Sequence, residues 1–290
     1  MPSFMENTSS LPRLPVIELP PFLEFLKLKN FPLKTYPAVN QPKRIENDTL
    51  YIYGPGSHAS PTASFDVDCL QTQIYFKFCN INVDVCNSNE PDASPSNKLP
   101  YFATVTGQVL AGAEIQQWIK DNNKYISLGE HQDEAIAFIS MIKSKLHSAW
   151  LFSAWLEPLN YNGNTFRMYY GHLPTPVNTI MASRKKDQVV EQLLADRDIL
   201  SREEIYADAA QTLEALSIKL AEDTYFFGKS EPTWMDAVVF SYLHAILAIP
   251  PVKKPDVTTE EKNQAAALRK LVLQHKNLVR FAKHINTEFL

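Results

Sequence analysis

The spacing of apolar and polar positions changes twice along the chain. Residues 1–48 are rich in proline and contain one short amphipathic stretch, Pro21 to Leu28. Short β-rich runs then alternate with helical periods up to about residue 124, whereas only helical periods follow Gln132. The pattern therefore predicts an N-terminal arm over residues 1–48, an α/β domain over 49–124 and an all-helical domain over 130–290.

The α/β part begins with a strand-like run that ends in a Gly-Pro-Gly turn. The predicted elements are a strand at Leu50–Tyr53, a helix over 67–81, a strand at 83–85, two short strands joined by a hairpin at Thr106–Gln108, and a helix over 112–120. We expect Ser64 to be the N-cap of the first helix, because a serine hydroxyl satisfies free amide groups at a helix start. The order β-α-β and then β-β-α predicts a compact mixed sheet.

The helical part contains five helical periods and one polar segment. Helices are predicted over residues 134–155, 189–194, 203–221, 232–249 and 262–285, with a loop over 160–176. The segment 232–249 is apolar almost throughout, which predicts a central position in the helical domain. Its start is predicted to carry a capping box, in which the Thr233 hydroxyl accepts from the Asp236 amide and the Asp236 carboxylate accepts from the Thr233 amide.

Composition and charge narrow the class of protein. The apolar fraction is 45% and the charged fraction 21%, which is typical of a globular protein with a sizeable core. A net charge of -4 argues against nucleic acid as a partner, because nucleic-acid binding usually needs a concentrated basic face. No stretch reaches the roughly 18 uninterrupted apolar residues of a transmembrane helix, so we expect any membrane association to be peripheral or through a partner.

Residues 251–290 have the opposite charge balance, with eight Lys and Arg against four Asp and Glu. Anionic lipid headgroups attract basic side chains of this kind. The candidates for such a contact are Arg269, Lys270, Lys276 and Arg280. We favour a solvated face for this segment and keep the lipid-facing role as the alternative.

The N-terminal arm concentrates large apolar side chains outside the predicted domains, at Phe22, Phe25, Leu26, Phe31 and Tyr36. One interpretation is a strap packed on the body of the same protein. The other is an arm docked on a partner, because exposed aromatic clusters mark interfaces. The residues themselves leave both interpretations open.

Two local features resemble a known superfamily. Leu99-Pro100 stands at the start of the third predicted strand, and Phe227-Gly228 precedes the capped helix that begins at Thr233. This combination resembles the glutathione-transferase fold, in which the corresponding proline is cis and lies beside the substrate pocket. The resemblance implies an α/β thioredoxin-like domain followed by an all-α glutathione-transferase C-terminal-like domain. Pro100, Thr233 and Asp236 would then have structural roles.

The helical half is most similar to the metaxin family. The likeness is carried by Ala137–Leu146, Trp155, Asn160-Tyr161 and His172–Asn178. The segment Phe31–Tyr36 is similar to the opening of metaxin-two-like members. Members of the sister branch usually begin their first strand almost at the N-terminus, whereas nearly fifty residues come first here.

The metaxin resemblance implies a non-enzymatic receptor subunit of the mitochondrial outer-membrane sorting and assembly machinery, peripheral on the cytosolic face. Its implied partners are a membrane β-barrel core subunit, a second metaxin-like subunit and β-barrel precursor proteins. The N-terminal arm is the segment that we expect to bind the barrel subunit. The sister metaxin-like subunit of the same complex is an alternative, and a cytosolic scaffold of the same fold is another.

An active glutathione-dependent transferase is the competing class. Such an enzyme needs a hydroxyl or thiol near the end of the first strand, and Ser57 and Ser60 lie in the turn that follows it. It also grips glutathione with an acid–Ser pair after the hairpin, where this chain has Ala111-Gly-Ala-Glu114 without a hydroxyl. Each lost hydrogen bond to a charged ligand group costs about 1.5–3 kcal/mol. We therefore predict no catalytic residues and no cofactor. No metal site is predicted either, because the seven histidines are scattered and none has metal-ligand spacing.

Overall fold

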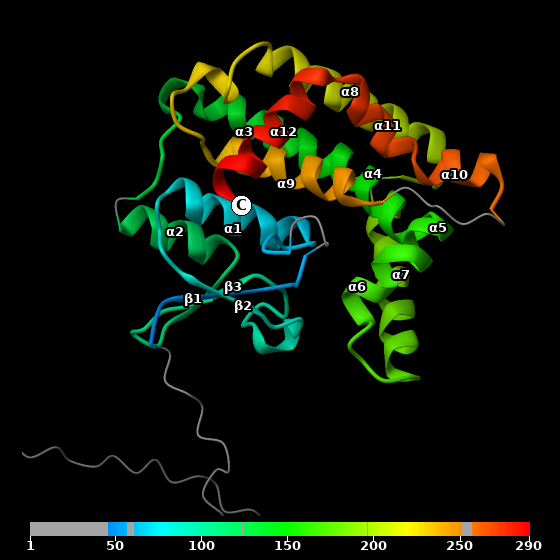
Figure 1. The fold of residues 1–290 in the computed structure, drawn as a ribbon, viewed down its shortest axis with the longest axis horizontal. Coiled ribbons are helices and arrows are strands. Elements are labelled where there is room, and N and C mark those ends of the chain that lie inside the picture. Colours follow the sequence, from blue (N-terminus) through cyan, green and yellow to red (C-terminus); the bar gives the residue numbers. More distant parts are fainter. Residues whose placement is uncertain (1–45, 57–60, 123, 196, 251–256) are drawn as a thin grey trace, which may run out of the picture. The chain divides into compact units, whose positions relative to one another are not determined.

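The computed structural model describes residues 46–56, 61–122, 124–195, 197–250 and 257–290. Residues 45–290 cluster as one compact unit, which Figure 1 shows as a small sheet and a larger set of helices. The predicted division of this unit between residues 124 and 130 stays a prediction. Several residues singled out in the sequence lie outside the described residues, namely Phe22, Phe25, Leu26, Phe31, Tyr36, Ser57 and Ser60.

A four-stranded mixed sheet forms the first part of this unit. Its strands are β1 (Thr49–Ile52), β2 (Asp84–Asn87), β3 (Tyr101–Ala103) and β4 (Val109–Ala111), and their order across the sheet is β2-β1-β3-β4. The β1–β2 pair is parallel, and the other two pairs are antiparallel. The predicted second strand at 83–85 is shifted, because its pairing with β1 aligns Thr49 with Asp84 and Ile52 with Asn87.

Two helices accompany the sheet, α1 (Val67–Phe78) and α2 (Ala113–Asp121). The prediction that Ser64 caps α1 is wrong. The Ser64 hydroxyl donates to the Tyr53 carbonyl at 2.6 Å, which ties it to the end of β1. Asp66 is the N-cap instead, since its backbone is extended and its carboxylate accepts from the Cys69 amide at 3.0 Å.

The helical part follows from residue 132. Its helices are α3 (Gln132–Met141), α4 (His147–Leu151), α5 (Pro158–Asn160), α6 (Phe166–Tyr170), α7 (Val177–Leu194), α8 (Arg202–Leu220), α9 (Trp234–Ala248), α10 (Thr259–Ala265), α11 (Ala267–Gln274) and α12 (Lys276–Phe289). Wide π turns at Ile142–Leu146, Phe152–Leu156 and Tyr161–Thr165 connect α3 to α6 along an almost continuous helical path.

The predicted loop over 160–176 is helical as far as Tyr170, and α7 begins at Val177 rather than at residue 189. The polar residues that suggest a loop are used inside the helical path. Asn160 donates to the Ser153 carbonyl at 3.0 Å, and Thr165 donates to the Ala154 carbonyl at 2.7 Å. These tertiary bonds satisfy side chains that would otherwise favour a turn.

The single helix predicted over 262–285 is also divided. It forms α10, α11 and α12, and the break before α12 lies at His275 (φ −99°, ψ 87°). The break lets Asn277 face α8, where its side-chain amide donates to the Ser217 carbonyl at 2.8 Å. Both α11 and α12 still pack against α9 on either side of the break.

Helix α9 lies at the centre of the molecule. Its side chains are buried on every face, including Val238, Phe240 and Leu243 with no exposed surface. Figure 1 shows α1 between the sheet and α9, and these two helices are in contact. One apolar cluster therefore joins the two halves, from Leu50 in β1 to Phe240 in α9. Among the described residues, no helix combines the length and apolar character that crossing a bilayer needs.

Candidate functional site

The start of α9 is a polar centre enclosed by the core. The capping box at Thr233 and Asp236 is present. The Asp236 carboxylate accepts from the Thr233 amide and hydroxyl, each at 2.7 Å, and from the Phe226 amide at 2.8 Å. Burial raises the pKa of Asp236 to about 6, and these donors oppose the rise. Because every one of these donors belongs to the chain, the centre fixes the Phe226–Gly228 turn against α9.

The Leu99–Pro100 peptide is cis and leads directly into β3. Across the hairpin, the Glu114 carboxylate accepts from the Ala111 amide at 3.1 Å. The glutathione-transferase resemblance places a ligand-binding acid–Ser pair at this helix start. In this chain the acid bonds internally, and Ala111, Gly112 and Ala113 supply no hydroxyl.

Aromatic side chains gather where β1 ends. Tyr53 contacts Phe65 and Tyr169, with ring centroids 5.8 and 5.1 Å apart, and Phe65 contacts Tyr169 edge-on at 4.9 Å. Trp155 extends the cluster, with its centroid 5.2 Å from that of Tyr169. Edge-to-face packing of this kind is stabilising and orders the rings. The cluster joins the end of β1 to α6, which lies more than 100 residues away in the chain.

Asp66 anchors this aromatic cluster. Its carboxylate caps α1 and accepts from the Tyr169 hydroxyl at 2.8 Å. Burial, and then the nearby charge of Asp68, raise the pKa of Asp66 to about 6, and its hydrogen bonds oppose the rise. Burial and Asp66 raise the pKa of Tyr169 well above its usual range, so its hydroxyl stays a donor. The pair is a polar link between the sheet half and α6.

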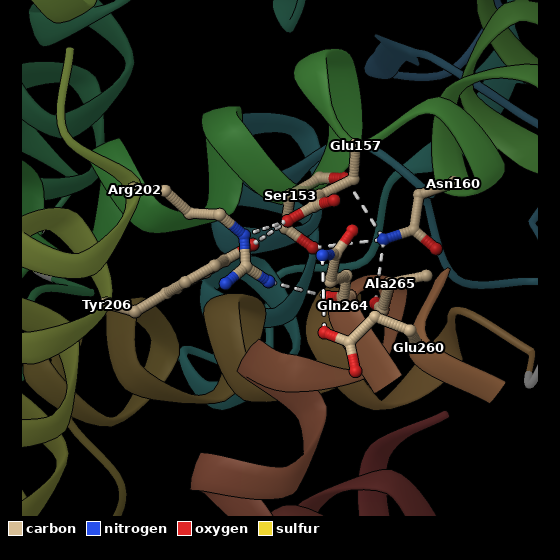
Figure 2. A network of polar contacts seen from close by, with 8 residues as sticks. All are labelled: Ser153, Glu157, Asn160, Arg202, Tyr206, Glu260, Gln264 and Ala265. Carbon is tan, nitrogen blue, oxygen red and sulfur yellow. Dashed lines mark hydrogen bonds and ion pairs between the residues drawn. The ribbon is translucent and has the colours of Figure 1, made fainter. Parts of the chain in front are cut away.

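A second polar network lies among α5, α8 and α10 (Figure 2). The Asn160 side-chain amide nitrogen is within hydrogen-bond distance of three acceptors: the Ser153 carbonyl at 3.0 Å, the Ser153 hydroxyl at 3.2 Å and the Ala265 carbonyl at 2.9 Å. Asn160 is only 2% exposed, so its amide is satisfied by these acceptors rather than by water.

The other half of the network in Figure 2 is centred on Glu157. Its carboxylate accepts from Arg202 Nε at 2.8 Å and from the Tyr206 hydroxyl at 3.1 Å. Arg202 also donates to the Gln264 carbonyl at 3.1 Å. Glu157 is buried, and burying a carboxylate is costly unless it is paired and hydrogen-bonded as it is here. The network thus holds α10 against α5 and α8.

The four basic residues considered for lipid contact have different surroundings. Arg269 donates to the Leu247 carbonyl and, at 2.8 Å, to the Ile249 carbonyl, so it caps the C-terminal end of α9. Arg280 pairs with Glu222 at 2.8 Å, and Lys270 donates to the Asn263 side chain at 2.8 Å. Lys276 is exposed. A lipid-facing role for this set stays a prediction.

The sequence reasoning missed the Asp66–Tyr169 and Glu157–Arg202–Tyr206 contacts. Their partners are 103, 45 and 49 residues apart. Residues so far apart in the chain form no short sequence pattern from which their contact could be predicted. Asn160 was found only because the Asn160-Tyr161 dipeptide belongs to the metaxin resemblance, and that dipeptide does not reveal its three acceptors.

Comparisons with known proteins agree on the class. The described fold is similar to the crystal structure of the glutathione transferase GSTFuA3 from Phanerochaete chrysosporium, with a TM-score of 0.56 at 14% identity over 85% of this chain and 99% of that one. A model of the glutathione S-transferase C-terminal domain matches residues 209–285. The fold class predicted from the sequence is confirmed, and the molecule is a glutathione-transferase-like protein.

Sequence comparisons narrow the class further. A family model described as outer mitochondrial membrane transport complex protein matches residues 69–186. Metaxin-2 of Homo sapiens is 28% identical over 249 residues, which cover 84% of this chain and 89% of that protein. Metaxin-1 of Homo sapiens is 31% identical over 196 residues, covering 63% of this chain and 42% of that protein. The chain belongs to the metaxin family.

Proposed function

We propose that this metaxin is a non-enzymatic receptor and assembly subunit of the mitochondrial outer-membrane sorting and assembly machinery. In this role it binds peripherally to the cytosolic face, contacts a membrane β-barrel core subunit and a second metaxin-like subunit, and helps receive β-barrel precursor proteins. The matched family of outer mitochondrial membrane transport proteins supports the location and the transport role.

One observation carries the non-enzymatic part of the proposal. The region beside the end of β1, where a transferase places its thiolate-stabilising group, holds the packed rings of Tyr53, Phe65 and Tyr169. Burial raises the pKa of the Tyr53 phenol well above its usual range. At the other side of the expected glutathione site, the Glu114 carboxylate bonds to the chain's own Ala111 amide. These internal contacts support a non-enzymatic role.

Within the family, we assign the chain to the metaxin-two-like branch, to which the fungal thirty-five-kilodalton subunit belongs. The alignment with Metaxin-2 covers 84% of this chain, whereas that with Metaxin-1 covers 63%. The likeness of Phe31–Tyr36 to the opening of that subunit supports the same assignment. The sister subunit is the alternative within the same complex.

The N-terminal arm is the proposed segment for binding the barrel subunit. Residues 45–290 cluster as a compact unit without residues 1–44, so a chain lacking residues 1–45 should fold. We expect this deletion to abolish co-purification of the barrel subunit from isolated outer membranes. Circular dichroism of the truncated chain is the folding control. Full co-purification by the folded, truncated chain would refute the arm as the binding segment.

The transferase alternative has a direct test. The purified full chain should not be retained on a glutathione column and should show no thiol-transfer activity. Ser57→Ala and Ser60→Ala are the matched variants, because these residues follow β1 where the transferase hydroxyl is expected. Turnover by the unmodified chain that disappears in either variant would overturn the non-enzymatic proposal.

A further inference from the structure

Helices α6 and α7 form a hairpin with an unusual charge balance. Residues 158–186 contain no Asp or Glu, although the whole chain has a net charge of -4. The same segment contains Arg167, Arg184, Lys185 and Lys186. Arg167, Arg184 and Lys185 are exposed, and Lys186 is half-buried, with its ammonium 5.1 Å from the centroid of the Tyr161 ring. Asp187 and Glu191 follow further along α7, so the hairpin has four Lys and Arg against two acids and is net positive on an acidic protein.

Helix α7 has two apolar faces. One face is buried by Ala182, Val189 and Leu193. The other carries three apolar side chains with large exposed fractions: Val177 at 45%, Ile180 at 50% and Met181 at 38%. Positions 177, 180, 181 and 184 are separated by threes and fours, so the exposed apolar residues and Arg184 share one side of the helix.

The hairpin stands apart from the other helices. Figure 1 shows α6 and α7 as a pair that extends away from α8 to α12, and the main contacts of α7 are with α6 and the π turn at Phe152–Leu156. Its exposed apolar side is therefore not covered by the rest of the described unit. A surface that combines a cluster of apolar side chains with basic side chains is typical of interfacial helices.

We propose that the α6–α7 hairpin docks on an anionic lipid surface. Val177, Ile180 and Met181 enter the boundary between headgroups and acyl chains. Arg184 and Lys185 remain at the headgroups, because their long side chains keep the charge in the polar layer. Charge complementarity favours this occupant, since anionic headgroups attract basic residues and the basic residues of the hairpin outnumber its two acids, Asp187 and Glu191.

This surface differs from the C-terminal basic segment considered in the sequence. There, Arg269 donates to carbonyls at the end of α9, and Arg280 forms an ion pair with Glu222. These two cations therefore already have partners within the protein. In the hairpin, the basic residues lie beside exposed apolar side chains, which supply the second attraction that stable membrane docking needs. The inference does not depend on the proposed barrel subunit, because lipid docking can be tested on vesicles that contain no other protein.

The test is flotation of the full chain with phosphatidylcholine vesicles, with and without one-fifth phosphatidylserine. We expect binding to the anionic vesicles that weakens with salt, and little binding to neutral ones. Arg184→Gln combined with Lys185→Gln should lower the affinity by about 25-fold, since each basic residue near such a surface contributes about fivefold. Ile180→Ser should lower it by roughly fivefold through lost apolar burial.

Matched controls separate the hairpin from general charge and hydrophobicity. Lys77→Gln combined with Lys98→Gln removes the same charge from exposed positions in the sheet half, and Ile218→Ser removes an isoleucine that is 73% exposed on α8. Both controls should bind as the unmodified chain does. No vesicle binding by the unmodified chain, or an equal loss in hairpin and control variants, would overturn the proposal. It would also be overturned if the hairpin variants bound vesicles normally but lost a protein partner from solubilised membranes.

Discussion

Replacing Asp236 with alanine should destabilise the protein more than changing an exposed acid. The carboxylate accepts three hydrogen bonds, from the amides of Phe226 and Thr233 and from the Thr233 hydroxyl. Asp236 and Thr233 have no exposed surface, and Phe226 is equally buried. In the variant, the two amides lose their acceptor where water cannot replace it.

The magnitude follows from the groups left without partners. Each buried amide without an acceptor costs about 1–3 kcal/mol. The variant also no longer has to bury a charge, a cost that the raised pKa of Asp236 reflects, and this offsets part of the loss. We therefore expect the free energy of unfolding to fall by about 3–4 kcal/mol. At roughly 2–4 °C per kcal/mol for a unit of this size, Tm should fall by about 6–16 °C.

Urea unfolding at pH 7, followed by circular dichroism and tryptophan fluorescence, measures this loss. Asp198→Ala is the control, because Asp198 is exposed, and it should change the free energy by less than about 0.5 kcal/mol. If Asp236→Ala were no more destabilising than Asp198→Ala, the three hydrogen bonds would not hold the start of α9, and the reasoning would be wrong.

Three further predictions concern the polar contacts. Asn160→Ala should lower the free energy of unfolding, measured by urea unfolding, by about 2–3 kcal/mol, because three acceptors lose the donor that they share. Asn162 is exposed, so the control Asn162→Ala should have little effect. Tyr169→Phe should lower the free energy of unfolding by about 1.5–3 kcal/mol in the same experiment, because the Asp66 carboxylate loses the hydrogen bond that the Tyr169 hydroxyl donates. An effect no larger than that of Tyr170→Phe would contradict this prediction. The pKa of Asp236 rises from the ordinary 3.8 to about 6 on folding, so the folded state binds this proton more tightly. The resulting stability is fully present below pH 3.8 and is lost as pH rises through 6. The unfolding free energy of the unmodified chain minus that of Asp236→Asn should therefore grow by about 2 kcal/mol between pH 7 and pH 4. A difference that stays constant over this range would show that the pKa of Asp236 is not raised.

The elements that could be predicted from the sequence are those with a strong local pattern. The apolar run of α9 and the Thr233–Asp236 spacing are contained in consecutive residues, so both the helix and its cap were predicted. The predicted helix over 203–221 likewise differs from α8 by one residue at each end. In these places local propensity and tertiary packing favour the same structure.

The segment from Asn160 to Pro176 shows the limit of local patterns. Its Asn, Gly and Thr residues are typical of a loop, yet most of it is helical because Asn160 and Thr165 bond to carbonyls of the preceding turn. The N-cap of α1, predicted at Ser64 and found at Asp66, shows the same limit. Both residues are good caps by type, and only the position of the Tyr53 carbonyl shows which of them is free to cap α1.

By itself, the sequence determined the order of the strands and helices as far as α2, the capped central helix, the metaxin resemblance and the lack of a hydroxyl at Ala111–Ala113. These features depend on residue type and short spacing, which folding does not alter. Only the tertiary structure decided that Asp66 meets Tyr169, that Arg269 faces the end of α9, and that Val177, Ile180 and Met181 remain exposed. Such contacts join residues far apart in the chain, and exposure depends on which faces the packed helices cover.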